Sequence, residues 1–130
     1  MEEIFRFQVL SVATLLAMGI IAVYSVLLPP PEVFGLALGW THIFGHFSAY
    51  LVLFVLAYGV LHMAPQPLKR GTCKLIAFVW AFSFSVLMEC LQLLTPLRQF
   101  EVEDLGLNLA GTMAGLVAIS VQQGKWNSKY

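Results

Sequence analysis

Long apolar stretches alternate along the chain with short polar or proline-rich interruptions. Four of these stretches can cross a bilayer as helices, because a transmembrane helix needs about 20 predominantly apolar residues. Their approximate bounds are 7–28, 43–63, 74–94 and 104–121. The pattern therefore predicts an all-α fold, an integral membrane four-helix bundle that forms a single domain over residues 1–130.

Composition agrees with a lipid environment. The chain is 59% hydrophobic and 11% charged, with a mean hydropathy of +0.83. A water-soluble domain carries about 25% charged residues, and a soluble core of this size could not bury so much apolar surface. The formal net charge is zero, which argues against a nucleic-acid partner, since nucleic-acid binding requires a basic surface. Membrane lipids are the partners that this composition predicts.

Basic residues predict how the bundle is oriented. With four spans, six of the seven lysines and arginines lie on one side of the membrane, and Arg98 alone lies on the other. Because Lys and Arg accumulate on the cytoplasmic side, we expect both termini to be cytoplasmic.

The segment Glu32–Phe44 is apolar but is too short and too rich in glycine to span the membrane. Its aromatic residues, Phe34, Trp40 and Phe44, are typical of the headgroup zone. We expect this segment to be partly helical and to lie at the outer interface between the first two spans.

Polar side chains interrupt the last three spans near one end. Ser85, Glu89 and Gln92 are separated by four and three residues, so they share one face of a helix. Such residues are costly in lipid and are therefore informative. In the expected topology, polar residues of three spans and the connection at Arg98 meet at the outer leaflet. The residues predicted to form this ligand pocket are His46, Tyr50, Glu89, Gln92, Arg98, Asp104 and Asn108.

A purely structural interpretation of the same residues remains open. Glu89 can pair with Arg98 or His46 and fix the bundle, while the amides of Gln92 and Asn108 hydrogen-bond between helices. The gathering of all these polar residues at one depth in the membrane favours the pocket interpretation over the structural one. Separately, the spacing Gly111-x-x-x-Gly115 predicts a close helix-packing face on the fourth span.

The chemistry available to the pocket is limited. A glutamate in lipid can act as a general acid or base, and an arginine binds phosphate or carboxylate in a bidentate manner. No catalytic residue is assigned, no metal-ligand spacing is recognised, and no cofactor or metal is expected. His42 and His62 are interpreted as interfacial, and ligation of a haem or pigment by His42, His46 or His62 is a remaining alternative.

One stretch resembles a known family. Glu89-x-x-Gln92, Pro96-x-Arg98 and Asp104-x-x-x-Asn108-x-x-Gly111 follow one another as in the VanZ-like family, and His46-Phe47-x-x-Tyr50 resembles an upstream motif of that family. The resemblance covers roughly residues 42–116. The family commonly has Asp-Lys where this chain has His42-Ile43, so any role of that pair in chemistry or headgroup binding is lost or changed here.

The resemblance implies a small multi-pass protein of the bacterial cell envelope, in the cytoplasmic (inner) membrane. The family's founding association is with resistance to a lipoglycopeptide antibiotic. We therefore expect a VanZ-like envelope protein whose pocket takes an amphiphilic or lipid-linked ligand. The alternative is a non-catalytic accessory subunit of a larger membrane complex, photosynthetic or respiratory, because four helices with short connections suit lateral packing.

Overall fold

A computed structural model describes residues 1–27, 39–66, 68–96 and 98–127, and within these ranges the chain is helical apart from Met1 and the connections between helices. All four helices are long and apolar enough to cross a membrane. A five-residue π-helical turn, η1, continues the first helix directly. The elements are α1 (Glu2–Ala22), η1 (Val23–Leu27), α2 (Gly39–His62), α3 (Arg70–Gln92) and α4 (Val102–Asn127).

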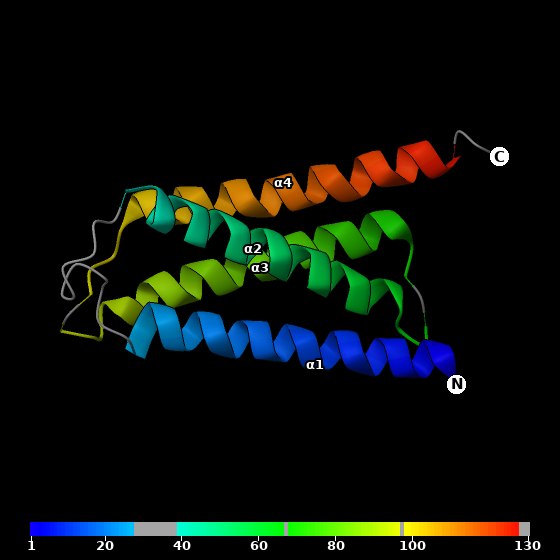
Figure 1. The fold of residues 1–130 in the computed structure, drawn as a ribbon, viewed down its shortest axis with the longest axis horizontal. Helices are drawn as coiled ribbons and strands as arrows, with labels where there is room; N and C mark the ends of the chain where they lie inside the picture. Colours follow the sequence, from blue (N-terminus) through cyan, green and yellow to red (C-terminus); the bar gives the residue numbers. More distant parts are fainter. Residues whose placement is uncertain (28–38, 67, 97, 128–130) are drawn as a thin grey trace.

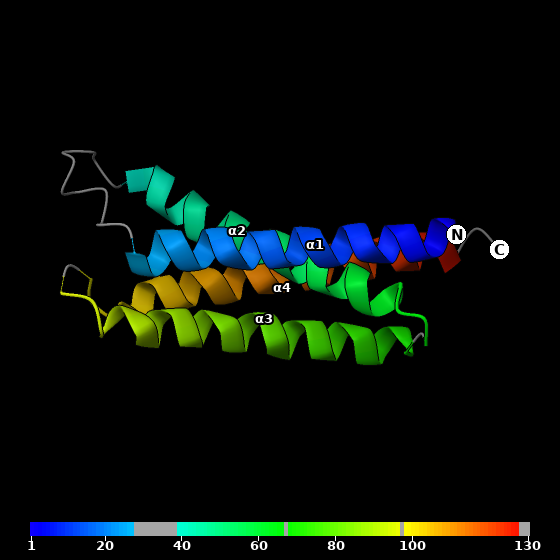
Figure 2. The ribbon, with the colours of Figure 1, turned by 90° about the horizontal axis from the view of Figure 1, so that it is seen from below.

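Successive helices run in opposite directions along a common axis (Figure 1). The start of α1 and the end of α4 therefore lie at the same end of the bundle, which we call the proximal end (Figure 1). The opposite end, where α2 and α4 begin and α3 finishes, is called the distal end. α2 contacts each of the other three helices, and its contact with α4 is the most extensive. A view at right angles shows α2 crossing behind α1, and α3 along the lower edge of the bundle (Figure 2).

The helices are longer than the predicted apolar spans. α1 begins at Glu2 rather than near residue 7, and α4 continues to Asn127 rather than ending near 121. Helical hydrogen bonding does not stop where the apolar stretch stops. In α1, acidic residues in the first turn also stabilise the start of the helix, because they interact favourably with the helix dipole. Of the predicted interfacial segment 32–44, residues 32–38 lie outside the described part of the chain, whereas residues from Gly39 onward belong to α2.

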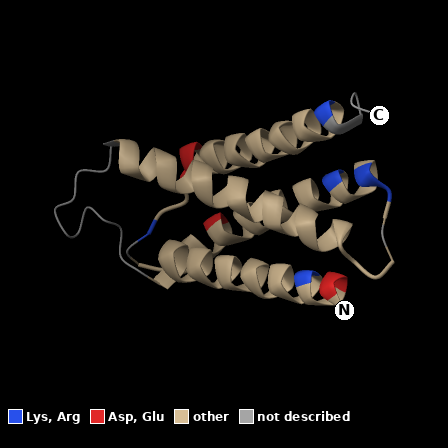
Figure 3. Cartoon of the chain, turned by 45° about the vertical axis from the view of Figure 1, so that its right-hand side comes forward, with Lys and Arg blue, Asp and Glu red and all other residues tan. Residues whose placement is uncertain are grey.

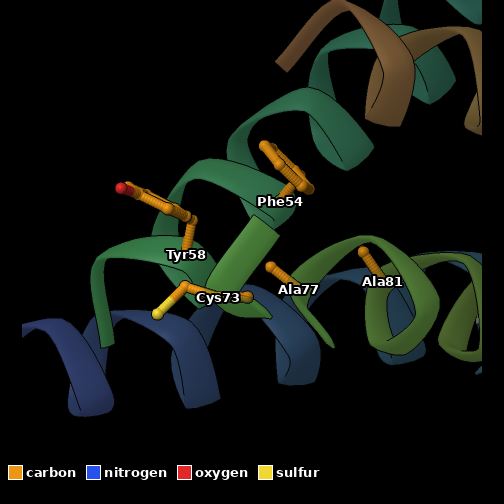
Figure 4. Packing of buried hydrophobic residues seen from close by; sticks show 6 residues of the cluster. Phe54, Tyr58, Cys73, Ala77 and Ala81 are labelled. Atoms are coloured by element: carbon orange, nitrogen blue, oxygen red, sulfur yellow. The ribbon is translucent and has the colours of Figure 1, made fainter. Parts of the chain in front are cut away.

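In the proximal half, apolar and small side chains fill the interface between α2 and α3. Phe54 and Tyr58 of α2 pack against Cys73, Ala77 and Ala81 of α3, all of them buried (Figure 4). Small residues at this contact let the two backbones approach, which is how transmembrane helices gain packing energy without a hydrophobic driving force.

Two glycines bring α4 against α2. A Cβ atom placed on Gly111 would lie 2.1 Å from the carbonyl oxygen of Phe47, and one on Gly115 would lie 2.7 Å from Cδ1 of Phe54. The first contact is with backbone, which cannot move aside. Gly111 is therefore required for the close approach of these two helices, and this approach places the polar side chains of α4 next to those of α2.

Charged residues separate along the axis of the bundle. Lysines and arginines gather at the proximal end, and acidic residues occur at both ends (Figure 3). Arg98 is the basic residue of the described connection between α3 and α4, at the distal end.

Candidate functional site

Three helices bring polar side chains together at the distal end. α2 contributes its first turns, α3 its last turns and α4 its first turns, and in each helix the polar residues follow at intervals of three or four, so that they share the inward face. Most are fully enclosed: Glu89 is 1% exposed and Asn108 is 1% exposed. Buried or half-buried polar residues of this region include His42, His46, Tyr50, Ser85, Glu89, Gln92, Asp104 and Asn108.

Two histidines of α2 face one carboxylate of α4. Nε2 of His42 lies 3.3 Å from Oδ1 of Asp104, and Nε2 of His46 lies 3.3 Å from Oδ2 of the same residue. The two imidazole rings contact each other edge-on, with 4.6 Å between their centroids. We call these three residues the histidine–aspartate cluster. Asp104 is buried, whereas the side chain of His42 remains 22% exposed at the rim.

Asn108 joins this cluster to α3. Its Oδ1 lies 2.9 Å from Nδ1 of His46, and its Nδ2 donates a hydrogen bond of 2.9 Å to Oγ of Ser85. Thr112, one turn further along α4, donates through Oγ1 to the backbone carbonyl of Asn108. A single amide therefore connects three helices, and both of its polar atoms are satisfied.

Other buried polar atoms in this region make no hydrogen bond within the described part of the chain. They are the hydroxyl of Tyr50, Oε2 of Glu89, Nε2 of Gln92 and Oδ1 of Asp104. Glu89 lies close enough to Asp104 and Arg98 to interact electrostatically with both. Leaving a buried polar group without a partner costs about 1–3 kcal/mol. Atoms of this kind are typical of a place where a ligand or ion completes the bonding.

Arg98 extends toward α1 as well as toward the polar residues. Its Nη2 donates a hydrogen bond of 2.9 Å to the backbone carbonyl of Tyr24, and its guanidinium lies 5.8 Å from the centroid of the Tyr24 ring. It also interacts electrostatically with His46 and Glu89. Arg98 therefore lies between the end of α1 and the polar region. It interacts with both rather than pairing with a single acidic residue.

A recess of about 150 Å³ opens between α1 and α2 at the distal end. One wall is largely apolar and comes from α1 and η1, including Ile20, Ile21 and Tyr24. The other wall comes from α2 and includes His42 and His46. The recess therefore leads from the lipid-facing side of the bundle to the two histidines.

Sequence comparison identifies the family. A protein-family model described as VanZ/LLP1 matches residues 4–123, nearly the whole chain. The chain belongs to the VanZ/LLP1 family. Neither a curated protein nor a solved structure gives a match. The resemblance noted in the sequence is thus confirmed and extends beyond residues 42–116, to include the first helix of this VanZ/LLP1 protein.

The sequence prediction omits His42 from the pocket of this VanZ/LLP1 protein, although the structure places it against Asp104. The signal that could have included it is its spacing of four residues from His46, which puts both rings on one face of a helix. Thr112 is also missing from the prediction. The hydroxyl of Thr112 donates to the backbone of its own helix, so the spacing between Thr112 and Asn108 does not indicate a role in the site.

The arrangement offers two kinds of interaction chemistry. The histidine–aspartate cluster presents two imidazole nitrogens and a carboxylate, which can exchange protons or bind a cation. Arg98, at the side facing α1, presents a guanidinium that suits phosphate or carboxylate groups. Among the described residues, neither histidine forms a hydrogen bond with a serine or cysteine, so the geometry gives no nucleophile–base pair.

Proposed function

We propose that this VanZ/LLP1 membrane protein binds an amphiphilic or lipid-linked molecule by its headgroup at the distal end of the bundle. The observation that carries the proposal is the recess between α1 and α2, which has an apolar wall and a wall with two histidines. A volume of about 150 Å³ admits a headgroup or part of one. The hydrocarbon tail of the ligand would stay in the surrounding lipid, alongside the exposed apolar side chains of α1.

Electrostatics supports an anionic headgroup. Arg98 is fixed beside the recess by its bonds to Tyr24, one of the residues that line it. A guanidinium in a region of low dielectric attracts a phosphate or carboxylate strongly and orients it through bidentate hydrogen bonds. Glu89 and Asp104 are buried and do not line the recess, so they would contact hydroxyl or amine groups of the same ligand only where it reaches past His46.

The distribution of lysine and arginine supports an orientation with both termini in the cytoplasm of a bacterial cell. The proximal end carries most of the basic residues, and such residues resist translocation across the inner membrane (Figure 3). The distal end would then face the outer leaflet. A ligand would enter the recess sideways from that leaflet, between α1 and α2.

Native mass spectrometry of the detergent-solubilised protein tests the proposal. A polyprenyl phosphate and phosphatidylglycerol serve as anionic probes, and phosphatidylcholine serves as the zwitterionic comparison. We expect retention of an anionic probe by the wild type, and loss of it in Arg98→Ala and Glu89→Ala. The matched controls are Arg70→Ala, an exposed arginine at the proximal end, and Glu103→Ala, an exposed acid next to Asp104.

Helix content by circular dichroism checks that each variant remains folded. Probe retention that is unchanged in both Arg98→Ala and Glu89→Ala would contradict the proposal. Purification in mild detergent examines the alternative function at the same time. Migration as a lone 14.4 kDa chain with retained lipid supports ligand binding, whereas stoichiometric co-migration with a large membrane complex would favour an accessory subunit.

A further inference from the structure

We propose that His42, His46 and Asp104 form a binding site for a divalent transition-metal ion, best suited to Zn²⁺. The three residues come from two helices, and each offers one ligand atom to the cluster. These ligand atoms all lie within 4.8 Å of one another. The inference goes beyond the proposed ligand pocket, because it concerns an ion held by the protein's own side chains.

The distances suit a shared ion better than direct hydrogen bonds. Ligand atoms bound tetrahedrally to zinc at about 2.0–2.1 Å stand roughly 3.3 Å apart. Each histidine lies at this separation from a carboxylate oxygen of Asp104, His42 at 3.3 Å from Oδ1 and His46 at 3.3 Å from Oδ2. A charge-assisted N–H···O bond is shorter, at about 2.7–2.9 Å. In addition, Oδ1 of Asp104 is buried and makes no hydrogen bond among the described residues, although His42 lies next to it.

Asn108 orients His46 as a metal ligand requires. Because the Nδ2 group of Asn108 donates to Ser85, its Oδ1 is the acceptor that faces Nδ1 of His46. That nitrogen then carries the proton, and in a neutral imidazole the other nitrogen, Nε2, presents a lone pair. This lone pair faces Oδ2 of Asp104 at 3.3 Å, which is repulsive unless a proton or a metal ion lies between the two atoms. Metal-bound histidines are oriented by such a second hydrogen bond.

The electrostatic surroundings also favour a cation. Asp104 interacts with the buried Glu89, so two carboxylates lie near each other in a helix-lined region of low dielectric. Carboxylates that stay ionised in such a place require compensation by a positive charge. Arg98 supplies one such charge but is also bonded to Tyr24 at the end of α1. A divalent ion in the histidine–aspartate cluster would compensate Asp104 directly.

The donor set selects the class of metal. Two imidazole nitrogens and one carboxylate are typical zinc ligands, while Mg²⁺ and Ca²⁺ prefer oxygen alone. Soft ions such as Cu(I) need sulfur ligands, which the cluster does not contain. Three protein ligands leave a fourth tetrahedral position for water or another molecule. Because His42 and His46 line the recess between α1 and α2, that fourth position would be reached from the recess.

Zinc titration of the full-length chain in detergent tests the site, with the protein purified without a polyhistidine tag and without added lipid. We expect one ion per chain by isothermal titration calorimetry. Replacement of a ligand, in His42→Gln, His46→Gln or Asp104→Asn, should weaken binding by at least about 100-fold, since second-shell changes alone cost about 10–100-fold. The matched control is His62→Gln, which changes a histidine at the other end of α2 that stacks on Tyr58 and should leave binding unchanged.

Cobalt provides a readout that does not depend on affinity. Co²⁺ in the wild type should give the visible absorption of a four-coordinate ion with nitrogen and oxygen ligands. The band should be absent in His42→Gln and unchanged in a Cys90→Ser variant, which removes the exposed thiol. A thiolate-to-cobalt charge-transfer band that disappears in Cys90→Ser would overturn the assignment of the ligands.

His42→Gln decides the question even if the two other ligand variants do not fold, because His42 lies at the rim of the cluster. Absence of stoichiometric zinc binding in the wild type would overturn the proposal. So would equal affinity in the wild type and in a folded His42→Gln variant. Arg98→Ala separates this test from that of the ligand pocket, since it should lose the anionic probe and keep the metal.

Discussion

The distal and proximal halves of the bundle bury their helix interfaces with different kinds of side chain. The proximal half packs Phe54 and Tyr58 against small residues of α3 (Figure 4). The distal half instead buries carboxylates, imidazoles and amides. Of the five buried polar atoms without a hydrogen-bond partner among the described residues, four lie in the distal half, and the other belongs to His62.

This contrast shows that close packing stabilises the proximal half, whereas the distal half keeps buried polar atoms without hydrogen-bond partners. In lipid, an apolar side chain gains little by leaving the hydrocarbon for a protein interior, so helices associate through close packing and hydrogen bonds. The proximal half follows this rule with closely packed small residues. The distal half keeps polar atoms unsatisfied, which lowers stability and is typical of a binding site.

The largest effect is expected from Gly111→Ala, which should disrupt both halves. The added methyl group would collide with the backbone of Phe47, so α2 and α4 must separate. We expect a loss of at least about 3 kcal/mol in unfolding free energy, at the upper end of overpacking effects. Titration with SDS, followed by circular dichroism, measures it. Gly106→Ala on the same helix meets no atom within 4 Å and should be neutral or slightly stabilising, and equal destabilisation by both variants would contradict the close approach.

Phe54→Ala should weaken the proximal half and spare the distal one. Phe54 is fully buried in the apolar cluster and also contacts Gly115 of α4. We expect a loss of about 2 kcal/mol, less than the roughly 3–5 kcal/mol of a water-soluble core, because lipid solvates apolar surface. Zinc affinity should stay within about twofold of the wild type. The lipid-facing Leu75→Ala is the control, and a large fall in zinc affinity in Phe54→Ala would show that the halves are coupled.

Ser85→Ala should have the smallest effect on stability and act only on the distal half. It removes the acceptor for Nδ2 of Asn108, a hydrogen bond worth about 0.6–1.7 kcal/mol between transmembrane helices. Because Asn108 would orient His46 less firmly, zinc affinity should fall by up to about tenfold. The same titrations on the exposed Ser83→Ala provide the control. Zinc affinity that is unaltered in Ser85→Ala would indicate that Asn108 orients His46 without its hydrogen bond to α3.

Part of the distal site could be predicted from residue spacing. Ser85, Glu89 and Gln92 repeat at helical intervals, so their common burial on the inner face of α3 follows from local geometry. The partner of each side chain does not follow in this way. Glu89 could equally have paired with His46, whereas the structure gives His46 to Asp104 and Asn108. Which residues meet depends on how far each helix is rotated and shifted against its neighbours.

The sequence by itself determined the number of long helices in the described part of the chain, their membrane-spanning character and the end of the bundle at which polar residues gather. These properties depend on the length of apolar stretches and on helical periodicity, which are local. The tertiary structure alone decided that His42 joins Asp104 and that Arg98 bonds to the end of α1. The reason is that the close approach of α4 to α2 at Gly111, and the position of α1 beside them, fix distances between residues far apart in the chain.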